Sequence, residues 1–190
     1  MAVGMIGHPV PSSRNFIALV DGENLVFRYQ EMLSNRKRHS NTEYIEDVFV
    51  WHQYMGVAMG WSLLRVNYYT SATGSEDRIA ALEKQISGVA VPRSGEAPCQ
   101  ICPRVFKKPA KSQKTKIVDI SIALDALRHS YHRDVEAIWL FSGDGDYLPL
   151  IKDIMRNGTQ VWLGAFSSGL NPALPPSVDR FVDLDQWFFV

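Results

Sequence analysis

AIWLFSGDGDY, residues 137–147, joins a run of apolar residues to a turn that carries Asp144 and Asp146. The run does not alternate with polar residues, which is typical of a strand buried on both faces, as in a parallel sheet. Gly-Asp-Gly is ordinary turn chemistry. Two acidic groups where a buried strand meets solvent also suit a site that attracts positive charge. The stretch therefore predicts a buried strand followed by either a turn or a site.

Apolar runs of the same kind recur along the chain. They predict strands at 16–20, 61–69, 137–141, 159–166 and 180–189. The segments between them favour helices at 75–88, 119–131 and 147–158, of which the first has a serine cap, early acids and a glycine stop. In the second, helical spacing predicts that one face packs inward, made of Ile120, Ala123, Leu124, Leu127 and Tyr131.

Strands that alternate with helices predict an α/β sandwich with a mostly parallel central sheet. Segment 34–60 fits either helix or strand, and segment 89–116 has no clear periodicity. The chain has 190 residues, which suits one domain with a proper core. We expect a flexible tail at 1–14 and a single domain at 15–190, with a basic, cysteine-containing insert near 89–116.

The composition is that of an ordinary globular protein, with 46% hydrophobic and 21% charged residues. The formal net charge is zero, so a polyanionic partner would have to be held by local charge. No stretch reaches the roughly 18 apolar residues that span a bilayer, and the first residues lack the pattern of a secretory signal. We therefore expect no membrane association and a cytoplasmic location.

Carboxylates follow two of the predicted strands. Asp21 comes directly after the 16–20 run, and Asp144 follows the 137–141 run. Ligands of open α/β sheets bind beyond the carboxyl ends of the strands, so both side chains belong to the same edge. Asp119 is expected in the first turn of a helix near this edge. The carboxylates of such a cluster would repel one another, so the cluster persists most readily when a divalent cation binds there, and hard oxygen ligands suit Mg²⁺ or Mn²⁺.

Each of these residues also has a purely structural interpretation. Asp21 could serve a turn, and Asn24 could cap a helix over 25–33. Asp119 could interact with a helix dipole, and Asp144 and Asp146 could be turn and cap residues. Taken one at a time, the structural roles are the better prediction, whereas the shared position at strand ends favours a site. Asp125 points about 120° away from Asp119 on a 3.6-residue helix, so we leave it out of the site.

The order of three motifs resembles a known family. VDGEN (20–24), KIVD (116–119) and SGDGDY (142–147), followed by a closing passage at 158–185, resemble the NYN domain of the PIN-like ribonuclease superfamily. The resemblance implies a PIN-like three-layer sandwich and a Mg²⁺- or Mn²⁺-dependent endoribonuclease. The implied metal ligands are Asp21, Asp119 and Asp144 for one or two ions, with Asp146, Asn24 and Ser142 completing the catalytic set.

The implied substrate is RNA, single-stranded or structured, whose phosphodiester bonds are cleaved. An alternative is an RNA-binding or regulatory module that keeps the fold without turnover. A phosphatase that forms an aspartyl-phosphate is excluded, because Asp21 is not part of a DxDxT motif. The sequence does not predict the RNA target or the oligomeric state.

A basic stripe precedes Asp119. No acidic residue occurs between 97 and 118, whereas this segment holds Arg104, Lys107, Lys108, Lys111, Lys114 and Lys116. We expect these side chains to contact RNA phosphates, which would position a strand without reading its sequence. Lys107 and Lys108 are predicted to lie in a mobile loop and to matter less than Lys114 and Lys116.

Cys99 and Cys102 have the CxxC spacing of half a zinc knuckle. No second CxxC pair or nearby histidine pair completes such a site. We interpret them as two ordinary thiols or as an incomplete knuckle.

Overall fold

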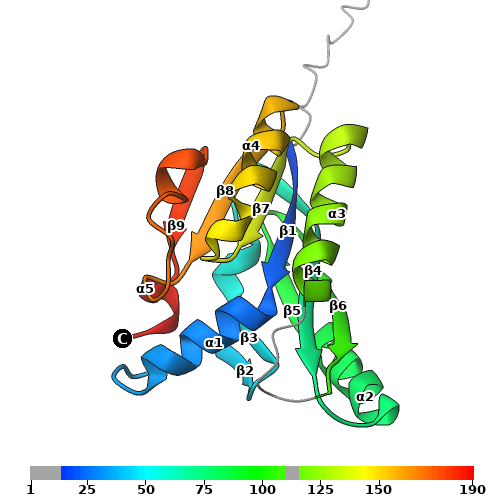
Figure 1. The fold of residues 1–190 in the computed structure, drawn as a ribbon, viewed down its shortest axis with the longest axis vertical. Coiled ribbons are helices and arrows are strands. Elements are labelled where there is room, and N and C mark those ends of the chain that lie inside the picture. The colour runs from blue at the N-terminus through cyan, green and yellow to red at the C-terminus, as the bar shows by residue number, and fades with distance from the viewer. Residues whose placement is uncertain (1–13, 110–115) are drawn as a thin grey trace, which may run out of the picture.

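A computed structural model describes residues 14–109 and 116–190. Along the chain its elements are β1 (Arg14–Asp21), α1 (Gly22–Leu33), β2 (Thr42–Ile45), β3 (Phe49–His52), η1 (Gln53–Gly56), β4 (Trp61–Ala72), α2 (Glu76–Ser87), β5 (Ala90–Arg93), β6 (Glu96–Lys107), α3 (Lys116–His132), β7 (Ala137–Phe141), η2 (Gly145–Tyr147), α4 (Leu148–Arg156), β8 (Gln160–Ala165), η3 (Pro175–Ser177), β9 (Arg180–Asp183) and α5 (Asp185–Phe188). The η elements are single 3₁₀ turns (Figure 1).

The central sheet has the strand order β5-β6-β4-β1-β7-β8-β9. All of its neighbouring strands are parallel except β5 and β6, which form an antiparallel hairpin. Strands β2 and β3 form a separate antiparallel pair. The predicted α/β architecture with a mostly parallel sheet is therefore confirmed.

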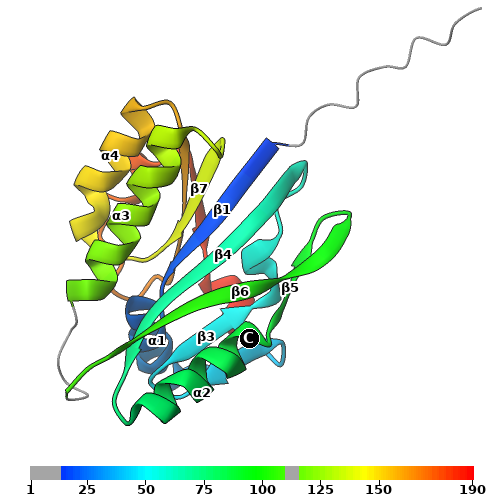
Figure 2. The ribbon, with the colours of Figure 1, turned by 90° about the vertical axis from the view of Figure 1, so that its right-hand side faces the viewer.

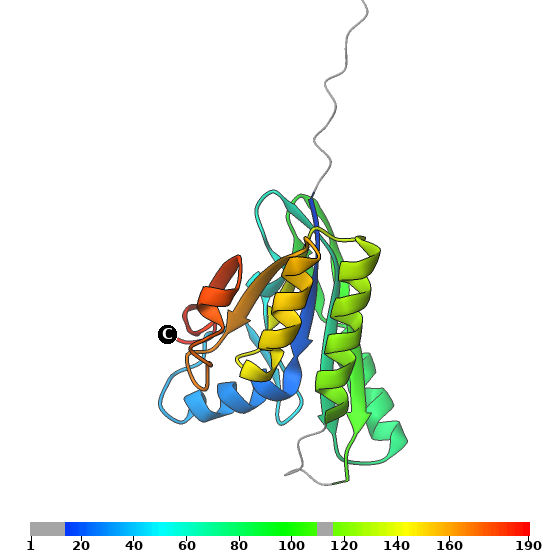
Figure 3. The same ribbon diagram turned by 45° about the horizontal axis from the view of Figure 1, so that its top comes forward.

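Helices cover both faces of the sheet. Figure 2 shows α3 and α4 on one side of the strands and α2 with β3 on the other, and Figure 3 shows α3 and α4 side by side. Alternate residues of β1 serve the two cores. Phe16, Ala18 and Val20 pack into the larger core, and Ile17 and Leu19 pack into the core beneath α3 and α4. An uninterrupted apolar run was the correct sign of a strand buried on both faces.

Two segments without a clear sequence pattern are hairpins. Segment 34–60 contains the β2–β3 pair, and segment 89–116 contains β5 and the long strand β6. β6 extends the main sheet by pairing with β4, so this segment is part of the fold as well as an insert. Its side chains are mostly exposed or half-buried, which explains the weak apolar signal.

The predicted strand at 180–189 is wrong in its second half. β9 ends at Asp183, and α5 follows it. The Asp183 side chain accepts a hydrogen bond from the Asp185 backbone N–H at 2.9 Å, which turns the chain. The turn places Phe188 and Phe189 against Tyr29, with ring centroids 5.7 and 5.3 Å away. Packing against α1 thus takes precedence over extension of the strand.

The predicted inward face of α3 is also wrong. The helix packs through Val118, Ile122, Asp125, Ala126 and Ser130, whereas four other large side chains with apolar surface are exposed. These exposed residues are Ile117, Ile120, Leu124 and Tyr131.

The physical reason lies in a buried polar anchor. Asp125 accepts a hydrogen bond from the Tyr69 hydroxyl at 2.6 Å and an ion pair from Arg104 at 2.8 Å. These contacts fix the rotation of α3, and its small residues let the helix approach the sheet. Like every other helix in the described part of the chain, α3 is too short or too polar to cross a membrane.

His52 is a buried base on the opposite side of the sheet. Its Nδ1 accepts a hydrogen bond from the Tyr54 N–H at 3.4 Å, and its Nε2 is buried without a partner among the described residues. Burial, followed by the nearby His39 ring, lowers the pKa of His52 from 6.5 to about 4. The folded protein therefore holds a neutral imidazole at this position.

Unfolding should become easier as the pH falls from about 6.5 towards 4, because over this range the unfolded chain protonates His52 and the folded chain does not. The contribution of neutral His52 to the free energy of unfolding is complete above pH 6.5 and is lost progressively down to pH 4. Denaturant unfolding of the parent and of His52→Gln at several pH values measures it. The difference in the free energy of unfolding between the parent and His52→Gln should shrink as the pH falls. A difference that stays constant with pH would contradict the prediction.

Candidate acidic site at the carboxyl edge of the sheet

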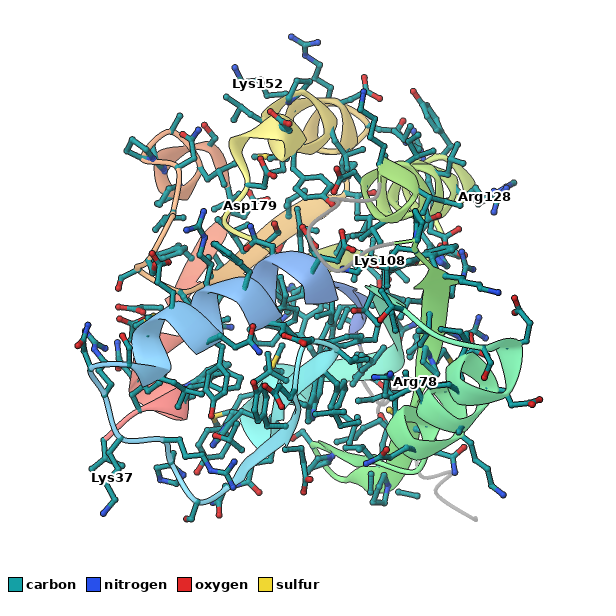
Figure 4. The ribbon with its side chains drawn as sticks, turned by 60° about the horizontal axis from the view of Figure 1, so that its bottom comes forward. Lys37, Arg78, Lys108, Arg128, Lys152 and Asp179 are labelled. Carbon is teal, nitrogen blue, oxygen red and sulfur yellow. The ribbon has the colours of Figure 1, made fainter. Side chains whose placement is uncertain are left out.

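The candidate site lies where the strand order changes direction. β1 pairs with β4 on one side and with β7 on the other. The connections that begin after these strands leave in opposite directions, which opens a crevice at their carboxyl ends. Figure 4 is turned so that this edge comes forward, with α1 across its middle. The residues that follow β1 and β7 therefore meet at a place suited to ligand binding.

Asp21 ends β1 and is 1% exposed. Its Oδ1 accepts a hydrogen bond from the Asn24 N–H at 3.0 Å, which makes Asp21, and not Asn24, the N-cap of α1. Its Oδ2 accepts a hydrogen bond from the Ser142 hydroxyl at 2.9 Å. Gly22 allows this turn, because a Cβ there would lie 2.3 Å from a ring carbon of Tyr68.

The turn after β7 is tied to the same place. The Gly143 N–H donates to the Asn24 side-chain oxygen at 3.0 Å, and the Asp144 N–H donates to the Ser142 hydroxyl at 3.2 Å. The Asp146 N–H donates to Asp144 Oδ1 at 3.0 Å. Asp144 thus has the predicted turn role in addition to its position in the crevice, while the Asp146 side chain is exposed. Structural and site roles coexist in this turn.

Tyr147 joins the carboxylates, and sequence reasoning missed it. Its hydroxyl lies 3.2 Å from Asp119 Oδ1 and 3.4 Å from Asp21 Oδ2, and the side chain is buried. Burial, followed by the charges of Asp21, Asp119 and Asp144, raises the pKa of Tyr147 well above its ordinary value of 10.0. The phenol therefore stays protonated and donates to an acidic group. Its position directly after the Gly-Asp-Gly-Asp turn was the available signal.

The structure brings most of the predicted site residues together. Asp21, Asn24 and Ser142 are linked by hydrogen bonds, and Asp119 in the first turn of α3 reaches them through Tyr147. Within 14–109 and 116–190, however, no three Asp, Glu, His or Cys side chains form a group close enough to hold one metal ion.

The donor set nevertheless fits a hard divalent cation. Mg²⁺ keeps several waters and is usually bound by one or two carboxylates. Asp21 and Asp119 approach the same hydroxyl, and Asp144 is close enough for its charge to act on it. Oxygen atoms predominate among these donors, which suits Mg²⁺ or Mn²⁺ and not a thiolate-binding metal.

Three residues of the basic stripe make ion pairs within the protein. Arg104 pairs with Asp125 and lies 5.3 Å from the Tyr69 ring centroid. Lys107 pairs with Glu76 at 2.7 Å, and Lys108 lies 3.6 Å from Glu23. The acidic partners come from α1, α2 and α3, so these three cations of the stripe are paired in space although the segment itself holds no acid.

The remaining stripe residues divide into two groups. Lys107 ends β6, so its assignment to a loop is wrong, whereas Lys108 follows the strand and its N–H donates to the Ala72 carbonyl at 3.0 Å. Lys116 is exposed at the first residue of α3. Lys111 and Lys114 lie outside the described residues.

The two cysteines lie on β6 as free thiols. Cys99 is half-buried and packs against the larger core, and burial raises the pKa of its thiol. Cys102 is exposed. Residues three apart in a strand point to opposite faces, so the CxxC spacing does not form a chelating pair here.

The family model for the NYN domain matches residues 16–185, which is nearly the whole chain. The protein therefore belongs to the NYN domain family, and the resemblance seen in the three motifs is confirmed.

A solved structure gives independent support for the fold. A protein of unknown function from Vibrio parahaemolyticus RIMD 2210633 aligns with a TM-score of 0.63 and 20% sequence identity. The alignment covers 96% of this chain and 100% of that chain. This similarity concerns the fold alone. No curated protein matches the chain.

Tyr147→Phe should lower the free energy of unfolding by about 1–3 kcal/mol, because buried carboxylates lose a hydrogen-bond donor. Tyr131→Phe is the matched control, since its exposed hydroxyl also donates to a carboxylate, that of Asp153, at 3.1 Å. Urea unfolding at pH 7 measures both. The control should match the parent, and equal stability of Tyr147→Phe and the parent would mean that the hydroxyl does not join the site.

Proposed function

We propose that the protein is a metal-dependent endoribonuclease that cleaves phosphodiester bonds of RNA. The observation that carries the proposal is the buried Tyr147 hydroxyl between Asp21 and Asp119, in a crevice that Asp144 also borders. Membership of the NYN family supports a nuclease. A fold that needed these acids only for turns would have no reason to gather them around one hydroxyl.

The contacts of each residue indicate its role in the proposed reaction. Asp21, Asp119 and Asp144 would hold Mg²⁺ or Mn²⁺, directly or through water. When bound, the ion offsets charge on the phosphate and lowers the pKa of a water molecule. Ser142 and Asn24 fix the Asp21 carboxylate and the β7 turn through their hydrogen bonds. Tyr147 remains a proton donor and keeps two carboxylates near each other.

Asp146 has a less direct role in the proposed reaction than its place in the SGDGDY motif implied. Its side chain is exposed, and only its backbone N–H bonds to Asp144. It would act on water at the entrance to the crevice. RNA would be the cytoplasmic substrate, and Lys116 the stripe residue placed to meet its phosphates.

Purified protein should cleave RNA with Mn²⁺ or Mg²⁺ and stop when EDTA is added. Asp144→Asn should lose at least about 100-fold in cleavage rate, because one charge that holds the cation is gone. Asp153→Asn is the matched control: it changes the same group on the surface of α4 and should cleave like the parent. Initial rates on a labelled RNA, with unfolding curves for each variant, measure the effect.

The alternative is a catalytically silent RNA-binding module of the same fold. It predicts equal RNA affinity for the parent, Asp144→Asn and Asp153→Asn without cleavage by any of them. Cleavage by Asp144→Asn at the rate of the parent would instead show that the site is assigned to the wrong residues.

A further inference from the structure

A pocket of about 460 Å³ lies beside the acidic site. Asn24 and Asp144 line both the pocket and the crevice, so the two are continuous. The other walls come from α1, Asp47 and Val48 in the turn between β2 and β3, the end of β4, the first turn of α2 and the residue after β6 (Figure 4 labels Arg78 and Lys108). Sites for small organic ligands commonly have volumes of about 300–1,000 Å³. The space next to the proposed scissile phosphate is therefore large enough for one nucleotide.

One wall of the pocket is an exposed aromatic face. Phe27 lies on α1 one turn after Asn24 and is 60% exposed. Val26 and Ala72 add apolar surface to the same cavity. An exposed aromatic ring in a groove is the usual platform for an unpaired nucleobase, because every base has a π-face that can stack.

Three cations also line the pocket. Arg78, on the first turn of α2, is exposed and makes no ion pair with another described residue. Lys108 is mostly buried, 3.6 Å from Glu23, whose carboxylate also accepts a hydrogen bond from the Ser71 hydroxyl. Lys108 is therefore partly neutralised, and Arg78 is the cation best placed to meet a phosphate.

Arg28 is held rigidly at the rim. Its guanidinium lies 5.0 Å from the Phe27 ring centroid, and one nitrogen lies 3.1 Å from Glu31. Gly169, with φ of +66°, packs so closely that a Cβ there would lie 2.0 Å from the guanidinium carbon. The Arg28 Nε is buried and has no hydrogen-bond partner among the described residues. Arg28 therefore adds positive charge at the rim that Glu31 partly offsets, while its Nε lies against Gly169.

We propose that this pocket binds one unpaired nucleotide of the RNA strand next to the bond that is cleaved. The base stacks on Phe27, and Arg78 contacts a flanking phosphate, with Arg28 adding positive charge at the rim. A base in a duplex cannot enter, so the protein selects RNA that is single-stranded at this position. The inference rests on the proposed function and names the substrate class for the same site.

The experiment combines a Phe27→Ala variant with RNA that lacks single bases. Affinity for a labelled single-stranded oligonucleotide is measured by fluorescence anisotropy in EDTA, so that nothing is cut. Phe27→Ala should bind about 5- to 100-fold more weakly than the parent, as expected for loss of one stacked base. In the parent, an abasic nucleotide at one position should cause a similar loss. With RNA that is abasic at that position, Phe27→Ala should bind as tightly as the parent, because the stacking contact between the base and the ring is already lost.

Arg78→Gln tests the phosphate contact. The plot of log affinity against log salt should become flatter by about 0.7 for a single strand, because one contact to the backbone is lost. Arg156→Gln, an exposed arginine on α4, is the charge-matched control and should keep the slope of the parent. Phe181→Ala on β9 is the aromatic control. Thermal unfolding of each variant verifies that it folds.

The outcomes separate this inference from the nuclease proposal. Cleavage by the parent together with unchanged affinity of Phe27→Ala would overturn the pocket and leave the nuclease intact. Absence of cleavage together with the pairing of Phe27 and one base would support the pocket and overturn the nuclease. Additive losses at every abasic position, or duplex RNA bound as tightly as single-stranded RNA, would also overturn the pocket.

Discussion

The carboxylate of Asp21 is the group on which the acidic edge depends. It ends the central strand, caps α1 by accepting the Asn24 N–H, and accepts the Ser142 hydroxyl from the end of β7. A buried carboxylate is costly unless its oxygens are hydrogen-bonded, and here both oxygens are. Tyr147 adds a further O–H at 3.4 Å. These hydrogen bonds offset the cost of burying the Asp21 carboxylate. They also join the end of β1 to the end of β7, and so they define the crevice.

A second buried carboxylate, Asp125, shows how a structural acid differs from those of the crevice. It lies on α3 six residues beyond Asp119 and accepts contacts from Tyr69, Arg104 and Arg128. Two guanidinium groups therefore balance its charge, and the phenol adds a hydrogen bond. Asp119 instead shares a tyrosine hydroxyl with a second carboxylate. Asp125 is thus held by two arginines and a hydroxyl as part of the core, whereas Asp21 and Asp119 meet around one hydroxyl at the carboxyl edge of the sheet, where oxygen donors suit a divalent cation.

The sequence predicted those features that depend on local pattern. Strands buried on both faces, the position of Asp21 and Asp144 at strand ends and the α2 helix all follow from periodicity and turn chemistry. Features that depend on distant partners were missed or wrong. The face of α3 was set by Tyr69 and Arg104, which no helical spacing reveals. Glu23 and Glu76 neutralise lysines that are more than thirty residues away along the chain. Tyr147 was read as the start of a helix because its partners lie on β1 and α3.

The pairing of Lys107 and Lys108 changes how a nucleic acid would be held. A stripe of unpaired lysines would attract any polyanion and would release many counterions on binding. In the described structure the lysines at the end of β6 already face carboxylates, so a phosphate would have to compete with Glu23 or Glu76. Among the described cations near the crevice, Arg78 in the pocket wall and Lys116 at the start of α3 make no ion pair with another described residue. A chain of zero net charge that holds RNA through few phosphates needs other contacts, and the exposed Phe27 ring beside the crevice supplies an apolar one. Recognition by stacking and a small number of cations is therefore the mode that this distribution of charge favours.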